Sequence, residues 1–398
     1  RTFGCQMNMH DSNRVEGLLL KKGYSIVEKP GDADILIFNT CSVRKNAEDR
    51  VFGVVGSLKR LKKKRKGLIF GIMGCMAEAK KEEIFERLEH VDFICGPANL
   101  DMVPDIIERL RANPGRIVQI GGFKSKRIPD FTLGNCAGHG IDTEYVKIIE
   151  GCSNFCSYCI VPYVRGPERS RPSKDIVKEV KRLLDKGVKK IMLLGQNVNS
   201  YGKGLKENID FVRLLQKIDK LIFKSYPQCR GALRLPYYDN DNDSDGDGND
   251  IGVNFATSHP KDANTELFKA MAGLKSIVKN LHLPLQSGSD KILKFMNRGY
   301  SYKHYKSLID SYRKIVKGGG LTTDLIIGFP GETEKDFKDT LKAVKEIKFD
   351  AAYIFKYSPR SGTKAALLED DVPQEEKERR HKILLETQKE ISLRKKNG

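Results

Sequence analysis

Six short apolar runs recur between positions 145 and 355, and each is followed by a stretch with helical character. The expected strands span 145–150, 190–194, 253–257, 280–285, 322–327 and 352–355. Regular alternation of strand and helix is typical of a parallel sheet, and six such units predict a partial (βα)6 barrel. In barrels of this type the reactive site lies at the C-terminal ends of the strands. We therefore expect functional residues directly after these runs.

A smaller α/β unit precedes the repeat. Strands are expected at 34–39, 67–73 and 93–95, and helices from an N-cap at Asp11-Ser12-Asn13 to Lys22, in a long charged stretch between the first two strands, and at 102–110. Because 398 residues exceed what one hydrophobic core usually organises, we expect two domains. They are a flavodoxin-like parallel sheet domain at 1–120 and the barrel at 144–372, joined by a glycine-rich and polar linker at 121–143. The fold class is α/β.

Two segments stand apart from this rhythm. Residues 223–250 include a run of aspartate and asparagine and are expected to be a polar, disordered insertion. The run fails as a helix-loop-helix calcium loop, because Gly252 stands where a bidentate glutamate is needed if the loop starts at Asp241. Residues 373–398 are expected to form a C-terminal helix.

The net charge of +19 favours a polyanionic partner such as nucleic acid, because basic side chains that neutralise phosphates release counterions. A merely lysine-rich composition explains the charge equally well. No apolar run reaches the ~18 residues that a transmembrane helix needs.

Three cysteines lie close together in the order Cys152-x3-Cys156-x2-Cys159. Three thiolates can hold three irons of a four-iron cluster and leave the fourth iron open to an outside molecule. Structural zinc needs a fourth ligand, and neither Cys136 and His139 upstream nor Cys229 downstream has a suitable spacing. Nine cysteines, an odd number, also argue against a disulfide framework.

Cys5, Cys41 and Cys75 each come directly after an expected strand. The C-terminal ends of parallel strands meet at one edge of a sheet, so these residues are expected to converge. A single free cysteine is usually a small buried hydrophobe. Three at equivalent positions favour a second cluster site instead, whereas Cys95, Cys136 and Cys229 are expected to be structural or incidental.

The spacing of Cys152, Cys156 and Cys159 resembles the signature of radical S-adenosylmethionine (SAM) enzymes. Nearly the whole chain is similar to the tRNA methylthiotransferase family of the MiaB type. The matching blocks are Gly4-Cys5-Gln6-Met7-Asn8, Asn39-Thr40-Cys41-Ser42-Val43-Arg44, Gly74-Cys75, Gly151-Cys152 to Cys159, Val161-Pro162-Tyr163-Val164-Arg165-Gly166, Ser170-Arg171-Pro172, residues 194–201, residues 283–290 and residues 327–333. The acidic insertion departs from the family's pattern. The chain also opens at Arg1, where we expect a truncated N-terminus, and it stops where the family's C-terminal TRAM β-barrel is expected to begin, so that this barrel is absent.

The resemblance implies two [4Fe-4S] clusters and SAM as cofactors. Cys152, Cys156 and Cys159 would ligate the cluster that binds and cleaves SAM, and Cys5, Cys41 and Cys75 an auxiliary cluster that supplies sulfur. The residues implied to contact SAM are Tyr158, Gly195, Gln196, Asn197, Gln286, Ser287, Gly328 and Glu332. For Tyr158, simple packing is an equal alternative. Arg165 and Arg171 are expected to contact RNA or the cofactor, while the basic run 59–66 is expected to be a solvated helix end.

The activity implied is transfer of a methylthio group to carbon 2 of N6-isopentenyladenosine beside the anticodon of tRNA. One SAM provides the methyl group and a second the 5'-deoxyadenosyl radical that attacks the unactivated C–H bond. Threonylcarbamoyl adenosine or a ribosomal protein aspartate is an alternative substrate, and a non-catalytic, metal-stabilised RNA-binding protein is an alternative of another class. We expect a tRNA partner, an electron donor such as flavodoxin, no membrane association and a monomer. The expected location is the cytoplasm, with organellar import left open.

Overall fold

The computed structural model describes residues 1–42, 45–123, 143–229, 231–232 and 250–396. The chain divides into two compact units, which are described separately below. The N-terminal unit contains residues 1–140, 150–153 and 160–169, and the C-terminal unit contains residues 141–149, 154–159 and 170–398. Residues 150–153 and 160–169, which the sequence assigned to the barrel domain, thus group with the N-terminal unit. Among the described residues, no helix combines the length and apolar character needed to cross a lipid bilayer.

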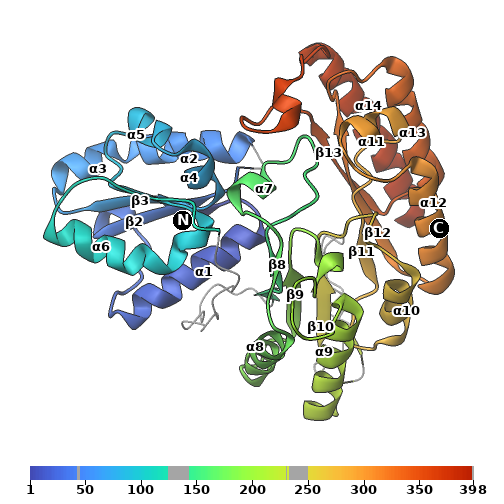
Figure 1. The fold of residues 1–398 in the computed structure, drawn as a ribbon, viewed down its shortest axis with the longest axis horizontal. Coiled ribbons are helices and arrows are strands. Elements are labelled where there is room, and N and C mark those ends of the chain that lie inside the picture. Colours follow the sequence, from blue (N-terminus) through green and yellow to red (C-terminus); the bar gives the residue numbers. More distant parts are fainter. Residues whose placement is uncertain (43–44, 124–142, 230, 233–249, 397–398) are drawn as a thin grey trace. The chain divides into compact units, whose positions relative to one another are not determined.

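The N-terminal unit is a parallel sheet with helices on both faces (Figure 1). Its strands are β1 (Thr2–Phe3), β2 (Ile35–Thr40), β3 (Ile69–Met73), β4 (Phe93–Cys95) and β5 (Ile117–Gln119). Its helices are α1 (Gln6–Lys21), α2 (Lys45–Ser57), α3 (Lys59–Lys64), α4 (Cys75–Lys80), α5 (Glu83–Arg87), α6 (Val103–Ala112) and the short α7 (Val161–Val164), with 3-10 turns η1 (Pro30–Asp32) and η2 (Pro97–Met102). The predicted α/β class is confirmed. The strand order is β1-β2-β3-β4-β5, whereas flavodoxin-like sheets have the order 2-1-3-4-5.

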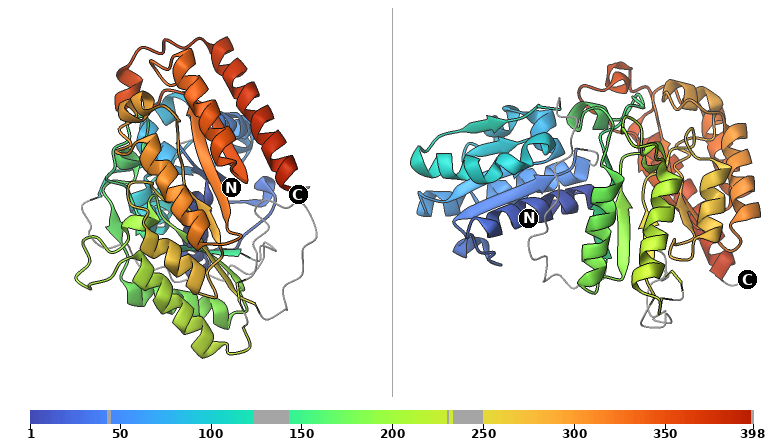
Figure 2. Two further views of the ribbon diagram at one scale, coloured as in Figure 1. Left: turned by 90° about the vertical axis from the view of Figure 1, so that its right-hand side faces the viewer. Right: turned by 60° about the horizontal axis from the view of Figure 1, so that its bottom comes forward.

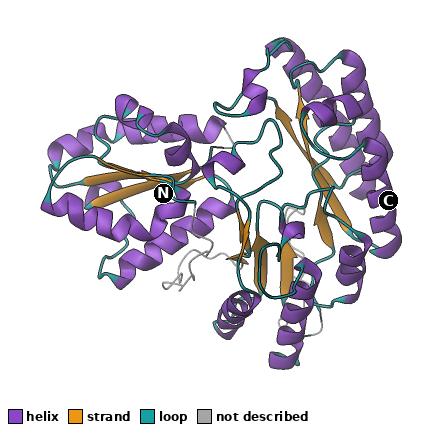
Figure 3. Cartoon of the chain, in the orientation of Figure 1, coloured by secondary structure: helices purple, strands orange, loops and turns teal. Residues whose placement is uncertain are grey.

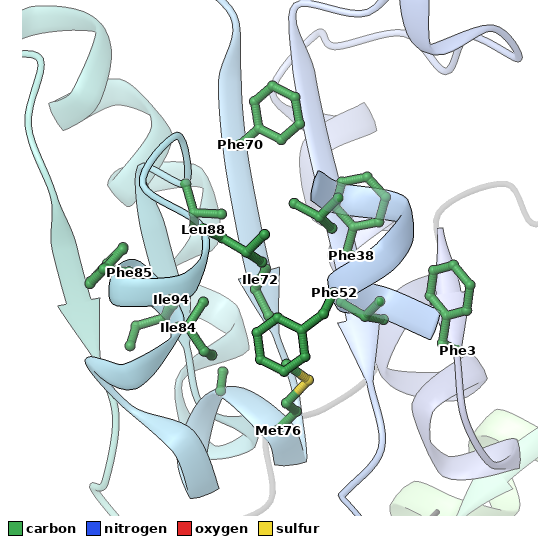
Figure 4. Packing of buried hydrophobic residues seen from close by; sticks show 14 of the residues in the cluster. Phe3, Phe38, Phe52, Phe70, Ile72, Met76, Ile84, Phe85, Leu88 and Ile94 are labelled. Atoms are coloured by element: carbon green, nitrogen blue, oxygen red, sulfur yellow. The ribbon is translucent and has the colours of Figure 1, made fainter. Parts of the chain in front are cut away.

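Two apolar layers hold this sheet. One contains Phe70 and Ile72 of β3 together with side chains of α2, α4 and α5, and Figure 4 shows its aromatic and aliphatic residues in contact. The other contains Ile69 and Met73 of the same strand with side chains of α1 and α6. Because successive strand residues point to opposite faces, one apolar run serves both layers, as expected for a buried parallel strand.

The predicted start of α1 is wrong. The helix begins at Gln6, and Asp11 lies inside it with no solvent exposure. Cys5 is the N-cap residue, and its backbone N–H donates to the Asn8 side chain in a capping box. The sequence concealed this start because cysteine is not a usual capping residue.

Other boundaries differ in smaller ways. The long charged helix is divided into α2 and α3 near Leu58, and β5 was not predicted. Most of the expected linker, residues 124–142, lies outside the described residues. So do residue 230 and residues 233–249 of the expected insertion, and residues 223–225 belong to α9.

The C-terminal unit contains the six predicted parallel strands in sequence order. They are β6 (Thr143–Lys147), β9 (Lys190–Leu194), β10 (Gly252–Phe255), β11 (Asn280–His282), β12 (Gly320–Ile327) and β13 (Ala351–Lys356). They form two three-stranded sheets, β6-β9-β10 and β11-β12-β13. A bridge between Val253 and Ile277 links β10 to the segment that precedes β11. The partial barrel predicted from the repeat is therefore confirmed.

Helices cover the outer side of these strands (Figures 2 and 3). They are α8 (Ser173–Asp185), α9 (Phe211–Ser225), α10 (Thr265–Gly273), α11 (Asp290–Phe295), α12 (Tyr302–Ile315), α13 (Glu334–Ile347) and the C-terminal α14 (Gln374–Lys396), with 3-10 turns η3 (Val198–Ser200) and η4 (Lys364–Leu367). A two-stranded sheet joins β7 (Ile149–Glu150) and β8 (Arg169–Ser170). The predicted cofactor residues Gly195, Gln196 and Asn197 follow the C-terminal end of β9, and Gly328 follows that of β12.

Candidate functional site

Three cysteines of the N-terminal unit follow three adjacent strands. Cys5 follows β1, Cys41 follows β2, and Cys75 opens α4 directly after β3. In the register of the sheet, Phe3 lies opposite Thr40, and the backbone N–H of Cys41 donates to the Phe3 carbonyl at 3.0 Å. The chains are so close here that a Cβ atom on Gly4 would lie 2.8 Å from the Cys41 Cβ. The predicted convergence of these strand ends is present.

Two asparagines brace these strand ends. The Asn8 Nδ2 donates to Asn39 Oδ1 at 2.9 Å, and the Asn39 Nδ2 donates to the Asn8 carbonyl at 2.8 Å. The Cys5 thiol donates to Asn8 Oδ1 at 3.2 Å. Gly74 has φ +96° and passes so close to Asn39 that any Cβ there would clash with its side chain. These hydrogen bonds and close contacts hold the backbone from which the side chains of Cys5, Cys41 and Cys75 project.

The thiols of Cys5 and Cys75 differ in acidity. A hydrogen bond with Cys41 lowers the pKa of Cys5 from 9.0 to about 6, with the Arg165 charge contributing further. Burial raises the pKa of Cys75 to about 11, although Arg165 acts against that rise. The cysteines among the described residues are free thiols. Thiolate is the form that binds metal, so the acidic Cys5 suits a ligand role.

Arg165 lies at the centre of a buried charge network. Its Nε donates to the Cys75 sulfur at 3.1 Å, and its terminal nitrogens donate to Asp11 at 2.7 Å and Glu150 at 3.2 Å. The Arg165 side chain is 2% exposed. Of the two predicted contacts of Arg165, with RNA or with the cofactor, this burial favours the cofactor, because the donors of Arg165 face a thiol and two carboxylates. A buried cation beside a thiol can instead offset the charge of a thiolate.

Arg171 is also withdrawn from solvent. Its guanidinium pairs with Glu179 at 2.7 Å and donates to the Lys147 carbonyl at 2.7 Å. With 2% exposure it braces β6 against α8, which does not favour an RNA contact, and its contact with RNA or the cofactor stays a prediction. In the basic run, Lys62 and Arg65 pair with Asp92 and Asp34, whereas Arg60, Lys63, Lys64 and Lys66 are exposed.

The loop with Cys152, Cys156 and Cys159 is fixed by its own backbone contacts. The Cys152 N–H donates to the Gly166 carbonyl at 3.2 Å within the N-terminal unit. In the C-terminal unit, the Cys159 N–H donates to the Cys156 carbonyl at 2.9 Å. Four residues can span at most ~14 Å, so the chain itself keeps Cys152 near Cys156.

The middle of this loop has an unusual backbone. Phe155 has φ +47°, a left-handed conformation that side chains rarely adopt. Asn297 holds it there, because its Nδ2 donates to the Phe155 carbonyl at 2.9 Å. Ser157 anchors the next turn with its N–H on the Met296 carbonyl and its hydroxyl on the Phe295 carbonyl. The segment after α11 therefore shapes the cysteine loop.

Arg298 is a site residue that the sequence did not reveal. Its Nη1 donates to the Cys156 sulfur at 3.2 Å and to the Tyr158 hydroxyl at 3.4 Å. Its Nε donates to the Tyr300 hydroxyl at 3.0 Å, and its Nη2 to the Pro284 carbonyl at 3.3 Å. Burial opposes its charge, but the neighbouring Tyr158, Tyr300 and Cys156 outweigh burial and raise its pKa well above the usual value. No motif spacing connects Arg298 with a loop 142 residues away.

Tyr158, a predicted cofactor residue, lies beside this arginine. Burial raises its pKa well above the usual value, so the hydroxyl stays protonated. Its ring packs against a cluster that includes Phe329 and Tyr357. The structure thus supports the packing role of Tyr158, and its contact with adenine stays a prediction.

Unpaired polar atoms gather at the strand ends of the barrel. After β9, the Gln196 Oε1 and Asn197 Oδ1 are buried and have no hydrogen-bond partner among the described residues. After β10, the same holds for the Ser258 hydroxyl and the His259 Nε2, and near β11 for the Gln286 Oε1. Buried polar atoms are normally paired, so this group fits a polar ligand such as the amino-acid part of SAM. The sequence missed Ser258 and His259, although both follow an expected strand.

His259 is held neutral in this group. Burial lowers its pKa from 6.5 to about 2, assisted by the charges of Arg298 and Lys261. Its Nδ1 accepts from the Lys261 N–H at 3.2 Å, and its backbone N–H is held by Asn199 at 3.0 Å. Because Nδ1 is an acceptor, the neutral ring carries its proton on Nε2. That N–H is therefore an unpaired donor.

The remaining predicted cofactor residues have clear structural partners. Gly195 passes so close to Ile149 that a Cβ would clash with that side chain. Ser287 is fully buried and bonds Thr340 at 3.3 Å. The Gly328 N–H donates to Glu332 at 2.6 Å, and Glu332 pairs with Arg380 at 2.7 Å. Gln286 differs, because its φ of +72° accompanies an unpaired amide oxygen.

The donor chemistry of both cysteine groups fits iron-sulfur clusters. Within the described residues, no three His, Cys, Asp or Glu side chains converge on a position for one metal ion. A four-iron cluster requires a wider arrangement, because each iron takes one thiolate. Arg165 and Arg298 place one guanidinium donor on a cysteine sulfur in each group.

Comparison with known proteins agrees with this fold. The model of the Radical SAM superfamily matches residues 146–344, and the model of Uncharacterized protein family UPF0004 matches residues 1–96. Among solved structures, the radical S-adenosylmethionine methyltransferase TsrM from Kitasatospora setae has a TM-score of 0.58 at 11% identity, covering 87% of this chain and 65% of that one. The cobalamin-dependent S-adenosylmethionine radical enzyme OxsB has a TM-score of 0.56 at 14% identity, covering 96% and 56%. This chain thus spans less than two thirds of both structures, and at these identities the likeness concerns the fold.

Curated relatives are much more similar in sequence. The tRNA-2-methylthio-N(6)-dimethylallyladenosine synthase of Clostridium novyi (strain NT) is 45% identical over 99% of this chain and 81% of its own length. The proteins of the same name from Thermoanaerobacter sp. (strain X514) and Carboxydothermus hydrogenoformans are 43% and 41% identical, over 99% and 98% of this chain and 78% and 83% of their own lengths.

The barrel, the cysteine loop and the match over residues 146–344 define a radical SAM enzyme, a class whose cofactors are SAM and a [4Fe-4S] cluster. Within that class, the chain belongs to the family of tRNA-2-methylthio-N(6)-dimethylallyladenosine synthases.

Proposed function

We propose that this chain transfers a methylthio group to carbon 2 of N6-dimethylallyladenosine in tRNA, beside the anticodon. The observation that carries the proposal is 45% identity to a synthase of that name over 99% of the chain. Threonylcarbamoyl adenosine, a ribosomal protein and a non-catalytic RNA-binding role have no support among these relatives.

We assign the two cysteine groups to two clusters. Cys152, Cys156 and Cys159 are the ligands of the cluster that binds SAM. Cys5, Cys41 and Cys75 are the ligands of the auxiliary cluster. The acidic Cys5 thiol and the strand-end convergence support the second assignment. When bound, SAM and the clusters supply the radical and sulfur chemistry that no ordinary side chain performs.

The protein's own residues position these groups. Arg298 and Arg165 each donate a hydrogen bond to a cysteine sulfur, which orients the ligand and lowers the electron density on it. The buried amide oxygens of Gln196, Asn197 and Gln286 can accept hydrogen bonds from the ammonium of SAM, and the His259 Nε2–H can donate to its carboxylate. Because these atoms are buried, water does not compete for them.

Exposed basic residues, rather than the buried Arg165 and Arg171, bind the tRNA. Arg60, Lys63, Lys64 and Lys66 are exposed at and after α3, and the chain's net charge is +19. Phosphate contacts by such residues supply affinity that falls with added salt. An electron donor such as flavodoxin, a monomeric state and a cytoplasmic location complete the proposal and follow the family resemblance alone.

Anaerobic reconstitution with iron and sulfide tests the assignment. The wild-type chain is expected to hold about eight irons, as two four-iron clusters require, and to form the methylthio nucleoside, detected by mass spectrometry of digested tRNA. Cys156→Ala should abolish SAM cleavage and leave about four irons. Cys41→Ala should also leave about four irons and keep SAM cleavage, but make no product.

Cys95→Ala is the matched control. Cys95 is a buried cysteine at the end of the neighbouring strand β4. The Cys95→Ala variant should keep the iron content of the wild type and form the methylthio product. Product formation by Cys41→Ala would contradict the auxiliary assignment. A wild-type chain that binds iron and cleaves SAM but leaves dimethylallyladenosine unchanged would refute the proposed function.

A further inference from the structure

One face of the β11-β12-β13 sheet carries exposed aromatic side chains. On β13, Tyr353 is 38% exposed and Phe355 is 40% exposed, while Ile354 between them is buried. On β12, Asp324 and Ile326 are partly exposed, while Leu325 and Ile327 are fully buried. Because side chains alternate along a strand, the buried set faces the covering helices and the exposed set faces away from them. In Figure 1, α13 and α14 lie on the outer side of this sheet.

The exposed residues form one continuous surface, which we call the aromatic face: His282, Asp324, Ile326, Tyr353 and Phe355. In the strand register, Tyr353 lies beside Asp324 and Phe355 beside Ile326. The His282 ring meets the Tyr353 ring edge-on with 6.2 Å between centroids, and its Nε2 lies 3.4 Å from an Asp324 carboxylate oxygen. The His282 Nδ1 is bonded to the Thr322 hydroxyl at 2.9 Å, which fixes the ring.

The aromatic face adjoins the cysteine loop within the same unit. Ile326 packs against the apolar cluster of Phe329, Tyr357 and neighbours, and Tyr158 packs against the same cluster. Tyr158 in turn directly precedes Cys159. A molecule resting on Phe355 and Ile326 therefore lies next to the residues that surround the proposed reaction centre.

The Tyr353 and Phe355 rings keep 38% and 40% of their surface exposed on the sheet face that points away from the helices. A purine presents two flat π-faces, and single bases that leave a nucleic-acid stack are commonly received by aromatic side chains. A dimethylallyl substituent adds an apolar branch that suits Ile326 and Phe355. An oxygen or nitrogen on the base edge can meet the polar pair His282 and Asp324.

We propose that the aromatic face is the binding surface for the purine base of the substrate and its neutral, apolar N6 substituent, with Phe355 and Tyr353 as the stacking residues. This inference rests on the proposed function. Asp324 adds a selective element, because its carboxylate repels a substituent that carries its own carboxylate, as threonylcarbamoyl adenosine does. Discrimination of this kind arises from a repulsive contact with the wrong ligand.

The test uses the anaerobically reconstituted full chain and an anticodon stem-loop RNA that contains N6-dimethylallyladenosine. Phe355→Leu keeps an apolar side chain but removes the ring, and should raise KM for this RNA and lower kcat/KM about fivefold or more, since stacking on an aromatic side chain contributes at least that factor. Phe355→Tyr keeps the ring and should stay within about threefold of wild type. Leu393→Ala, at a 50% exposed apolar residue of α14, is the control and should leave both constants unchanged.

The selective role of Asp324 is tested in the same assay by competition. A stem-loop with threonylcarbamoyl adenosine should inhibit the wild type weakly and Asp324→Asn at least fivefold more strongly, while its unmodified counterpart inhibits both equally. Equal kcat/KM for wild type and Phe355→Leu would overturn the inference, and an unchanged inhibition ratio for Asp324→Asn would overturn the charge selection. If the wild type itself makes no methylthio product, the proposed function fails instead, so the two failures are distinct.

Discussion

Replacing Arg298 by methionine should loosen the cysteine loop. Methionine has a similar length and no donors, so Arg298→Met removes the hydrogen bonds to the Cys156 sulfur, the Tyr158 hydroxyl, the Tyr300 hydroxyl and the Pro284 carbonyl. Two of these groups keep other partners, because the Tyr300 hydroxyl also donates to the carbonyls of Pro284 and Leu285. The Cys156 sulfur and the Tyr158 hydroxyl lose theirs.

The expected destabilisation follows from these two orphaned groups. A buried polar group without a partner costs about 1–3 kcal/mol, so two cost about 2–6 kcal/mol. Removing a buried guanidinium also relieves its desolvation, which favours the lower end. We expect the free energy of unfolding to fall by about 2 kcal/mol. For a unit of this size that corresponds to a loss of about 4–8 °C in Tm.

Urea denaturation of the metal-free protein under anaerobic, reducing conditions measures this change. The rate of Cys156 alkylation by iodoacetamide should rise in parallel, because the loop opens more often. Arg379→Met is the matched control: this arginine is 46% exposed and pairs with Glu376 of α14 and Glu334 of α13, so its loss should cost much less than that of Arg298. A cost for Arg298→Met no greater than that of the control, with unchanged alkylation, would refute a bracing role for Arg298.

Three further changes have defined outcomes. In the folded protein His259 is neutral, with a pKa of about 2, whereas in the unfolded chain it takes up a proton below pH 6.5. Lowering the pH from 6.5 to 4 should therefore destabilise the wild type. The loss should be about 1.4 kcal/mol per pH unit greater than for His259→Gln, as measured by urea unfolding. Gly195→Ala places a Cβ against Ile149 and should cost about 1–3 kcal/mol in the same assay, with Ile149→Ala in the double variant restoring part of it. Glu332→Ala removes the buried carboxylate that pairs with Arg380 and accepts from the Gly328 N–H. Because Arg380 keeps its pair with Glu376 at 2.7 Å, the change should cost about 1–3 kcal/mol.

Each of these changes has a control at a site of the same residue type. His304→Gln alters an exposed histidine and should leave the pH slope as in the wild type. Gly273→Ala adds a methyl group where nothing lies within 4 Å and should be neutral or slightly stabilising. Glu334→Ala removes a 46% exposed carboxylate and should cost less than 1 kcal/mol. If a variant and its control change the free energy of unfolding, or its pH dependence, by the same amount, the named contact does not contribute to stability.

The six barrel strands and the C-terminal helix follow directly from the sequence because their signals are local. Each strand is a short apolar run, and the expected strand at 190–194 matches β9 residue for residue. The start of α1 did not follow, because its cap is formed by Cys5 and Asn8, a pair without a common capping pattern. The strand order of the N-terminal sheet could not be predicted from the sequence either, since the order depends on which strands pair with one another across long connections.

The cysteine groups were located by spacing and by their place after strands, but the residues that surround them were not. Arg165 and Arg171 were expected to contact RNA or the cofactor because they belong to the motif that follows the cysteine loop. Instead they pair with carboxylates in the interior. Arg298, Ser258 and His259 belong to no motif. They were identified as site residues only from the structure, in which the segments after β10 and α11 lie near the strand ends.

By itself, the sequence determined the class of fold and the family and predicted two groups of three cysteines, because periodicity and spacing are properties of neighbouring residues. Only the tertiary structure decided which cations face a thiol, which polar atoms are left without partners and which aromatic rings stay open on the barrel sheet. The reason is physical: burial and pairing depend on side chains that lie more than a hundred residues apart along the chain, as Arg298 and Cys156 do.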